Sequence, residues 1–331
     1  MASVLSKSIA VRAARLVTRP SKAVDAEAMV PLVLSAAPLV EQAVGSSIEI
    51  ESIRVRNLSR WEWIDSNIDS YFRLMGQVLP EKSPIGAVEL NSASLGLALG
   101  IFSTRVMGQY DPGLTGTPGI LWMVEENIAE LAKAAGVGMR ETSLWVMIHE
   151  LTHRAQFVGN PWLVPELFGL IKGVAAGSAI SFLDVVANLV DALVKFRSLR
   201  ALDPLAAFLP PDLHDRLERI TSIMTVLEGQ AEWVMRSIDR SVLPNIELLE
   251  QAVDRRRQRS GTSQLLSGAL GVGAKQRQYR RGYDFFRMVA SARPGLDRLV
   301  LRSAASIPLP SELDEPSAWI RRVVGNAVEL A

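Results

Sequence analysis

The sequence predicts a mainly α (α+β) fold, in which many helices accompany one small sheet. Apolar residues recur at helical spacing along most of the chain, whereas only two segments show a strand-like pattern. With 331 residues, 48% of them hydrophobic, the chain is long enough to bury a large core. We therefore expect a single domain over 1–331, in which an N-terminal helical part, 1–58, packs on a larger core, 59–331.

The predicted elements follow the chain in order. The helices cover about 3–18, 22–44, 60–77, 127–136, 141–158, 180–199, 213–240, 245–258 and 279–292. Strands are indicated in 48–56, where β-branched residues partly alternate with polar ones, and in 119–127, where one strand runs into a helix. Pro and Gly cluster at 111–119 and 261–273, which favours loops there.

Two apolar stretches, 90–104 and 168–194, need to be compared with a membrane span. The first is too short, and three charged residues interrupt the second. A span needs about 20 largely apolar residues, so we expect no membrane span and interpret both stretches as buried elements. The N-terminal segment lacks the apolar core of a secretory signal, although a mitochondrial-type presequence is an alternative. We expect a cytoplasmic location.

The composition excludes several classes of function. The chain has 36 Lys and Arg residues against 35 Asp and Glu residues. It therefore lacks the excess of basic residues that is typical of nucleic-acid-binding proteins. The arginine-rich run 254–259 is interpreted as a solvated helix end. The absence of cysteine excludes disulfides, thiolate zinc sites and iron–sulfur clusters. Any transition-metal site must therefore use the three histidines and carboxylates.

His149, Glu150 and His153 form an H-E-x-x-H pattern within the apolar segment 144–157, LWVMIHELTHRAQF. On a helix, residues four apart project from the same face, so both imidazoles can bind one ion. Glu150 lies about 100° around the helix from His149, where it can reach a metal-bound water. In a chain with three histidines, the pattern arises by chance on the order of 0.002 times. A metal site on a buried helix therefore explains the pattern better than two solvated histidines.

The third ligand must come from elsewhere, because a catalytic zinc usually has three protein ligands and one open position. The segment 224–235, MTVLEGQAEWVM, carries Glu228 and Glu232 four residues apart at the edge of an apolar helical stripe. One of them can bind zinc while the other hydrogen-bonds a ligating histidine and fixes its tautomer. We expect Glu228 to be the ligand; the alternatives are two surface glutamates and a His214 ligand.

The two motifs together, H-E-L-T-H and the later E-G-x-x-E, resemble the gluzincin arrangement. This resemblance implies that Glu228 is the third zinc ligand and that Glu232 supports a histidine. Gluzincins usually have Asp at the second of these positions, so Glu232 departs from their pattern.

A more extensive resemblance is to the zincin-like (zinicin) metallopeptidase family of actinobacteria. The similar segments are 60–75, 105–113, 121–132, 144–163, 227–235, 255–261 and 275–289. The resemblance runs from about 60 to the C-terminus and implies a zincin-like helical domain with a small sheet, a zinc site and a hydrolase. One branch of the family is associated with biosynthesis of a deazaflavin coenzyme.

The expected mechanism is hydrolysis by zinc-activated water, with Glu150 as general base and then as the proton donor to the leaving amine. The oxyanion needs a donor, for which we name Tyr279, with Tyr283 and Tyr110 as alternatives, although each of these rings can simply be packing. Arg280 and Arg281 either bind a substrate carboxylate or are solvated.

Two further segments have expected roles near the active helix. In zincins a strand above this helix pairs with the extended substrate, and LWMVEEN (121–127) is the candidate for that strand. Glu141, at the start of the helix, is expected to complement the helix dipole.

The predicted function is that of a zinc metallohydrolase, most simply a metallopeptidase with a peptide or small amide substrate. The alternatives are a zinc hydrolase of a non-peptide amide or ester, such as a cofactor intermediate, and a non-catalytic zinc-binding protein. Activated water acts on all these substrate classes. The sequence leaves the substrate, the oligomeric state and the metal used in cells open.

Overall fold

The computed structural model describes residues 6–19, 29–78, 87–113, 116–177, 211–259 and 272–328. The helices are α1 (Lys7–Leu16), α2 (Val30–Val44), α3 (Arg60–Val78), α4 (Ala87–Ser103), α5 (Glu125–Ala135), α6 (Met139–Gly159), α7 (Leu163–Gly177), α10 (Pro211–Ser237), α11 (Ile246–Arg259), α13 (Val272–Ala292) and α14 (Pro316–Val328). Short 3₁₀ helices are η2 (Ile50–Ser52), η4 (Leu296–Leu299) and η5 (Ala304–Ser306). The predicted mainly α class is confirmed.

The small sheet contains β1 (Val55–Leu58), β2 (Gly108–Asp111) and β3 (Ile120–Val124) in the order β1-β3-β2. β1 pairs with β3 in parallel and β2 pairs with β3 in antiparallel fashion, so β3 is the central strand. β3 runs directly into α5, as predicted for 119–127. β2 was not predicted, because its four residues adjoin the Pro- and Gly-rich stretch.

Several helices also differ from the prediction. α4 covers most of the stretch 90–104, for which no type of element was predicted, and α14 lies where no element was predicted. α7 begins earlier than the apolar stretch 168–194. Residues 178–194 of that stretch lie outside the described residues, as does the predicted helix 180–199. The division of one domain into 1–58 and 59–331 remains a prediction.

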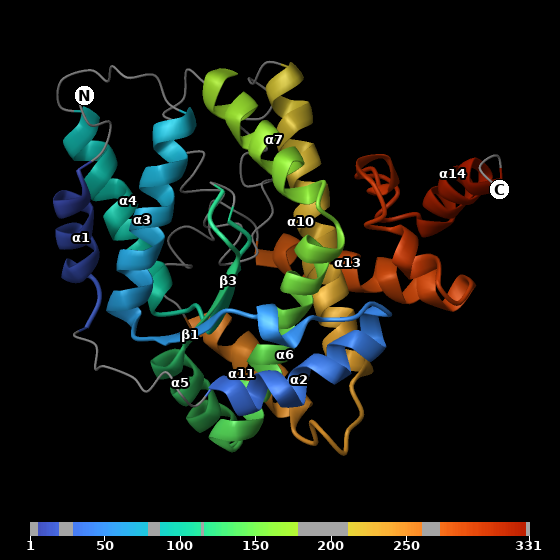
Figure 1. Cartoon of the computed structure of the whole chain (residues 1–331), viewed down its shortest axis with the longest axis horizontal. Helices are drawn as coiled ribbons and strands as arrows, with labels where there is room; N and C mark the ends of the chain where they lie inside the picture. Colours follow the sequence, from blue (N-terminus) through green and yellow to red (C-terminus); the bar gives the residue numbers. More distant parts are fainter. Residues whose placement is uncertain are drawn as a thin grey trace.

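α4 was hard to recognise as a helix because it contains two glycines, which lower helix propensity. The structure shows why glycine occurs there: a Cβ on Gly96 would lie 2.1 Å from the Ala10 carbonyl oxygen, and one on Gly100 would lie 2.5 Å from that of Ala14. The backbones of α1 and α4 therefore cross at close range. Figure 1 shows α1, α4 and α3 together at one end of the molecule, with α13 and α14 at the other.

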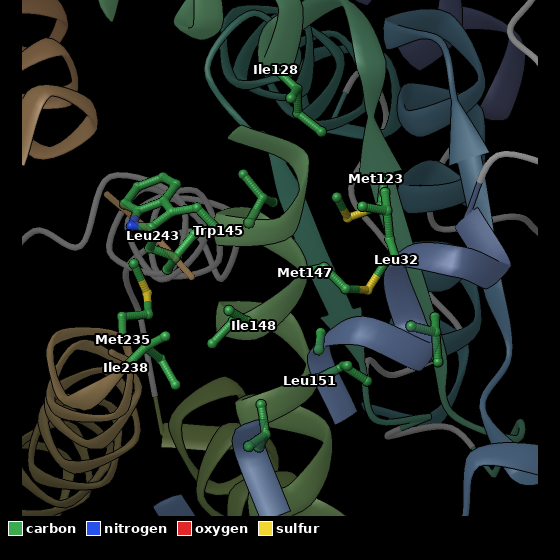
Figure 2. Close-up of a cluster of buried hydrophobic side chains, with 14 of the residues drawn as sticks. Leu32, Met123, Ile128, Trp145, Met147, Ile148, Leu151, Met235, Ile238 and Leu243 are labelled. Atoms are coloured by element: carbon green, nitrogen blue, oxygen red, sulfur yellow. The ribbon is translucent and has the colours of Figure 1, made fainter. Parts of the chain in front are cut away.

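Helix α6 lies between these ends, and its apolar side chains form the centre of one core cluster (Figure 2). Its buried residues contact α2, β3, α10 and the segment after α10. The labelled members are Leu32, Met123, Ile128, Trp145, Met147, Ile148, Leu151, Met235, Ile238 and Leu243. Burying side chains of this size stabilises a fold by roughly 1.5–3 kcal/mol each. The core therefore fixes the helix that carries the H-E-x-x-H pattern.

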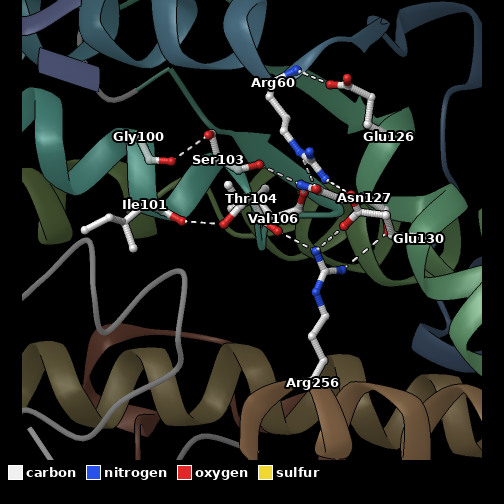
Figure 3. Close-up of polar contacts among 10 residues, drawn as sticks. All are labelled: Arg60, Gly100, Ile101, Ser103, Thr104, Val106, Glu126, Asn127, Glu130 and Arg256. Atoms are coloured by element: carbon white, nitrogen blue, oxygen red, sulfur yellow. Dashed lines mark hydrogen bonds and ion pairs between the residues drawn. The ribbon is translucent and has the colours of Figure 1, made fainter. Parts of the chain in front are cut away.

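A polar cluster joins α3, α5 and α11 beside the sheet (Figure 3). Arg256 donates to the Thr104 carbonyl oxygen and pairs with Glu130 at 3.2 Å, and Arg60 donates to Asn127 at 2.8 Å. The interpretation of 254–259 as a solvated helix end is therefore wrong for Arg256. Its guanidinium satisfies a carbonyl and a carboxylate where α11 packs on α5.

The apolar stretches do not form a membrane span in the part of the chain that the structure describes. No helix there combines the length and the apolar content needed to cross a bilayer.

Candidate metal centre

Helices α6 and α10 bring three predicted ligands together. His149 Nε2 lies 3.1 Å from His153 Nε2, and the Glu228 carboxylate oxygens lie 3.5 Å and 3.4 Å from these two nitrogens. The three side chains are 13–21% exposed, so they are largely enclosed without being sealed from solvent. Within the described ranges, they are the group of His, Asp and Glu side chains whose atoms lie close enough to hold a metal ion.

The spacing of the three ligand atoms fits a zinc ion. With bonds of about 2.0–2.1 Å, two ligands of a tetrahedral zinc are about 3.3 Å apart. The observed separations of 3.1, 3.4 and 3.5 Å agree with that value. Two imidazoles and one carboxylate are also a known catalytic zinc set. The side chains therefore match the ion in both geometry and chemistry.

The other ring nitrogens of the histidines have partners that were not predicted. His153 Nδ1 lies 2.9 Å from Gln156 Oε1, and His149 Nδ1 lies 3.1 Å from the Met235 sulfur. Burial lowers the pKa of His153; the Glu228 carboxylate opposes this effect, and the nearby His149 adds to it. The lowered pKa keeps His153 in the neutral form that binds a metal.

Glu232 lies one helical turn after Glu228. Its carboxylate pairs with Arg236 at 2.9 Å, and Arg236 also pairs with Glu250 at 3.3 Å. The Arg236 guanidinium lies over the Tyr283 ring, 4.8 Å from its centroid. The role of Glu232 as the support of a ligating histidine remains a prediction.

Glu150 is 6% exposed and lies beneath the edge strand β2. Its pKa is raised well above the ordinary value, first by burial and then by the Glu228 charge, while the Tyr110 backbone N–H donates to the carboxylate and opposes the rise. A Cβ on Gly108 would lie 2.6 Å from the Glu150 Cγ atom. β2 therefore holds the expected base in a narrow space.

The tyrosines named as oxyanion donors have different positions. Tyr279 belongs to α13, but its side chain lies outside the described residues. Tyr283 packs against Arg236. Tyr110 is on β2, with its ring centroid 6.0 Å from that of Phe157 on α6. Each assignment as a donor remains a prediction.

The strand chosen for substrate pairing was wrong. β3, which contains most of LWMVEEN, is hydrogen-bonded to β1 on one side and to β2 on the other. A central strand has no free backbone groups for a further strand. β1 and β2 are the two edge strands, and the backbone of β2 reaches Glu150. The misassignment arose because β2 is too short to be recognised in the sequence.

The remaining candidates that the structure describes contact other residues. His214 is 3.5 Å from Glu218, its side chain is 44% exposed, and it does not belong to that group. Glu141 accepts hydrogen bonds from the Asn245 backbone and side chain at 2.8 and 2.9 Å. Arg281 pairs with Asp314 at the surface, and the Arg280 side chain lies outside the described residues.

Comparisons with known proteins cover nearly the whole chain. A model of a family described as zincin-like metallopeptidase matches residues 3–320. A solved structure from Chloroflexus aurantiacus, described as a "putative hydrolase with a novel fold", is 25% identical, with a TM-score of 0.68 over 96% of this chain and 98% of that chain. No curated protein matches. Both of these similarities support a hydrolase.

Proposed function

This chain belongs to the zincin-like metallopeptidase family, and on that premise we propose that it is a zinc-dependent peptidase. The observation that carries the proposal is the spacing of His149, His153 and Glu228, whose ligand atoms are separated by 3.1–3.5 Å. These three residues would hold the ion. When bound, zinc supplies a Lewis acid that polarises a carbonyl and makes water more acidic.

The proton chemistry belongs to Glu150. Its carboxylate accepts a proton from the attacking water and then donates it to the leaving amine. A raised pKa suits this exchange, because it makes the carboxylate a stronger base towards water than an ordinary glutamate. Enclosure by Gly108 and Tyr110 leaves Glu150 little freedom to rotate away from that role.

An extended substrate is proposed to pair with β2. In the described part of the chain, the outer side of this strand is an edge of the sheet next to α6, and strand addition at such an edge provides backbone hydrogen bonds to a peptide from the groups that Glu150 does not use. Because β2 also donates from Tyr110 to Glu150, a peptide paired with it would lie beside the base.

The proposal is tested first by metal analysis. Purified protein is expected to contain about one zinc per chain, and His149→Ala and His153→Ala are expected to lose it. Protein that binds no zinc under any loading condition would refute the metal site.

Catalysis is tested with a peptide library and two matched variants. Glu150→Gln is expected to keep zinc and to lose about 10²–10⁴-fold in rate, because it removes the general base. Glu247→Gln, a change at an exposed side chain of α11, is expected to keep full activity. Equal rates for wild type and Glu150→Gln on every substrate would refute catalysis through Glu150.

The same library should include non-peptide amides and esters, because the proposed chemistry serves those substrates as well. Cleavage of them alone would identify a hydrolase of a small metabolite, and zinc binding without any cleavage would favour a binding protein. A cytoplasmic location, an actinobacterial origin and the association with deazaflavin biosynthesis remain predictions; cell fractionation tests the first.

A further inference from the structure

Gln156 is a buried side chain that connects the two helices of the metal centre. Its Oε1 atom lies 2.9 Å from His153 Nδ1, on the same helix. Its Nε2 atom donates across to α10, to the Leu227 carbonyl oxygen at 2.8 Å and to Gln230 Oε1 at 3.0 Å. The residue is 3% exposed, so these contacts are protected from water.

The hydrogen-bond partners fix which way the Gln156 amide faces. A backbone carbonyl oxygen can only accept, so the atom facing Leu227 must be the amide nitrogen. The two donors of that nitrogen are then used by Leu227 and Gln230. The atom facing His153 is therefore the amide oxygen, which can only accept. A reversed amide would leave two oxygens facing each other in a buried space.

This orientation determines the tautomer of His153. Since Gln156 Oε1 accepts, His153 Nδ1 must carry the ring proton. A neutral imidazole has a single proton, so Nε2 keeps its lone pair. That Nε2 atom lies 3.4 Å from the Glu228 carboxylate and 3.1 Å from His149 Nε2. His153 is therefore already in the form that binds a metal.

We propose that Gln156 is a positioning residue that sets both halves of the zinc site at once. It fixes the ring of His153 on α6, and it holds the backbone of Leu227, the residue directly before Glu228, on α10. The proposal rests on the proposed zinc function. It assigns to a neutral amide a role for which the sequence indicated a carboxylate, Glu232.

The experiment measures the affinity of purified protein for zinc alone, by competition with a chelator. Gln156→Leu removes every polar contact, and loss of such outer support typically weakens metal binding by about 10–100-fold. Gln156→Glu keeps the acceptor for His153 and is expected to recover part of that loss. Thr152→Val is the matched control, because Thr152 is buried on the same helix and its hydroxyl donates to Ile148 on that helix.

A second readout is the ¹⁵N NMR spectrum of the histidine rings, with thermal unfolding to verify that each variant folds. In wild type, His153 is expected to show a protonated Nδ1 with and without zinc. Gln156→Leu is expected to lose that fixed signal, and Gln156→Glu to keep it. If Gln156→Leu does not fold, the wild-type spectrum and Gln156→Glu still test the assignment.

The outcomes separate this inference from the proposed function. Wild-type protein that binds no zinc would refute the function. If Gln156→Leu binds zinc as tightly as wild type, the proposed role of Gln156 is refuted while the zinc function stands. The same holds if wild-type protein binds zinc through His153 Nδ1. A loss of affinity in Thr152→Val as large as that in Gln156→Leu would show a general effect of α6 and would also overturn it.

Discussion

The position of the Glu150 side chain depends on the backbone of β2, which packs against it at Gly108 and donates to it from Tyr110. Its side chain is enclosed between α6 and the edge strand β2, and its carboxylate lies close enough to Glu228 to feel that charge. The strand can approach this closely because Gly108 has no side chain. Every other residue would place a Cβ within 2.6–2.9 Å of the Glu150 side chain.

Gly108→Ala is therefore expected to impair catalysis while zinc binding persists. The added methyl group must displace either the Glu150 carboxylate or β2, and a misplacement of about 1 Å can cost on the order of 10²-fold in rate. Steady-state kinetics and metal analysis check this. Gly159→Ala, where a Cβ would contact nothing within 4 Å, should behave as wild type. Full activity in Gly108→Ala would show that the close approach is irrelevant.

At this scale the sequence predicted the candidate ligands but not the residues that contact their other atoms. His149, His153 and Glu228 follow from residue type and helical spacing, which are local properties. The contact of Met235 with His149 and that of Gln156 with Leu227 do not, because they join residues 86 and 71 positions apart in the chain; only the Gln156–His153 contact is local. Glutamine and methionine are also ordinary core residues, so their types gave no signal.

Among the elements, α10 and α13 cross with their backbones in contact. A Cβ on Gly229 would lie 2.4–2.7 Å from the Gly282 backbone, and one on Gly282 would lie 2.4 Å from the Thr225 carbonyl oxygen. Gly229 directly follows Glu228, so this crossing fixes the backbone position of the proposed third ligand. It explains glycine at both positions.

Gly229→Ala should separate the two helices. Overpacking of this kind costs about 1–3 kcal/mol, and the shift of Glu228 should also weaken zinc binding. Chemical denaturation and zinc competition measure the two effects. Gly169→Ala, on α7 with open space around it, is the matched control. A variant as stable as wild type would contradict the close crossing.

One ion pair contributes to the attachment of α14, beside the buried Trp319 ring. Arg322 Nε and Nη2 each donate at 2.7 Å to the Glu312 carboxylate. Burial raises the pKa of Glu312, but the hydrogen bonds from Arg322 and from the Leu309 N–H, with the Arg322 charge, outweigh burial. The net pKa therefore lies below the ordinary 4.5.

A lowered pKa gives this pair a defined pH dependence. The folded state binds the proton less well than the unfolded state, so the stabilisation is full above about pH 4.5 and is lost as the pH falls through the folded pKa. Glu312→Gln should cost about 1–2 kcal/mol at pH 7, and its difference from wild type should shrink in acid. Denaturation at several pH values checks this.

The control for that prediction is Glu315→Gln. Glu315 pairs with Arg321 at 3.1 Å, but both side chains are more than 60% exposed, and such pairs contribute little. Its stability should differ little from wild type at every pH. A constant difference for Glu312→Gln across the acid range would contradict the assigned pKa.

At the level of elements, helix positions could be predicted from the sequence, whereas the order of the strands could not. Helices α3, α6 and α11 were predicted within a few residues, because α3 and α11 have a periodic apolar face and α6 is a long, largely apolar segment without Pro. Strand order was not predictable, because it depends on which short segments pair with each other across the chain. The four residues of β2 turned the expected edge strand β3 into the centre.

For the whole molecule, α6 and α10 connect the separate cores. α6 lies in the cluster shown in Figure 2, and α10 contributes buried residues to all three clusters, including Ile220, Val234 and Val226. The proposed zinc ligands lie where these two helices meet. A bound ion would therefore link the parts of the fold that carry most of its buried apolar surface.

Removal of zinc should consequently destabilise the whole chain. The ligands come together only when α6 and α10 are packed, so zinc binds the folded state, and at a concentration 100 times its dissociation constant it adds about 2.7 kcal/mol. For a chain of this size, that corresponds to a rise in melting temperature on the order of 5 °C. Thermal unfolding with added zinc or a chelator measures the shift. His153→Ala should show no shift, and an equal shift in this variant would place the stabilising ion elsewhere.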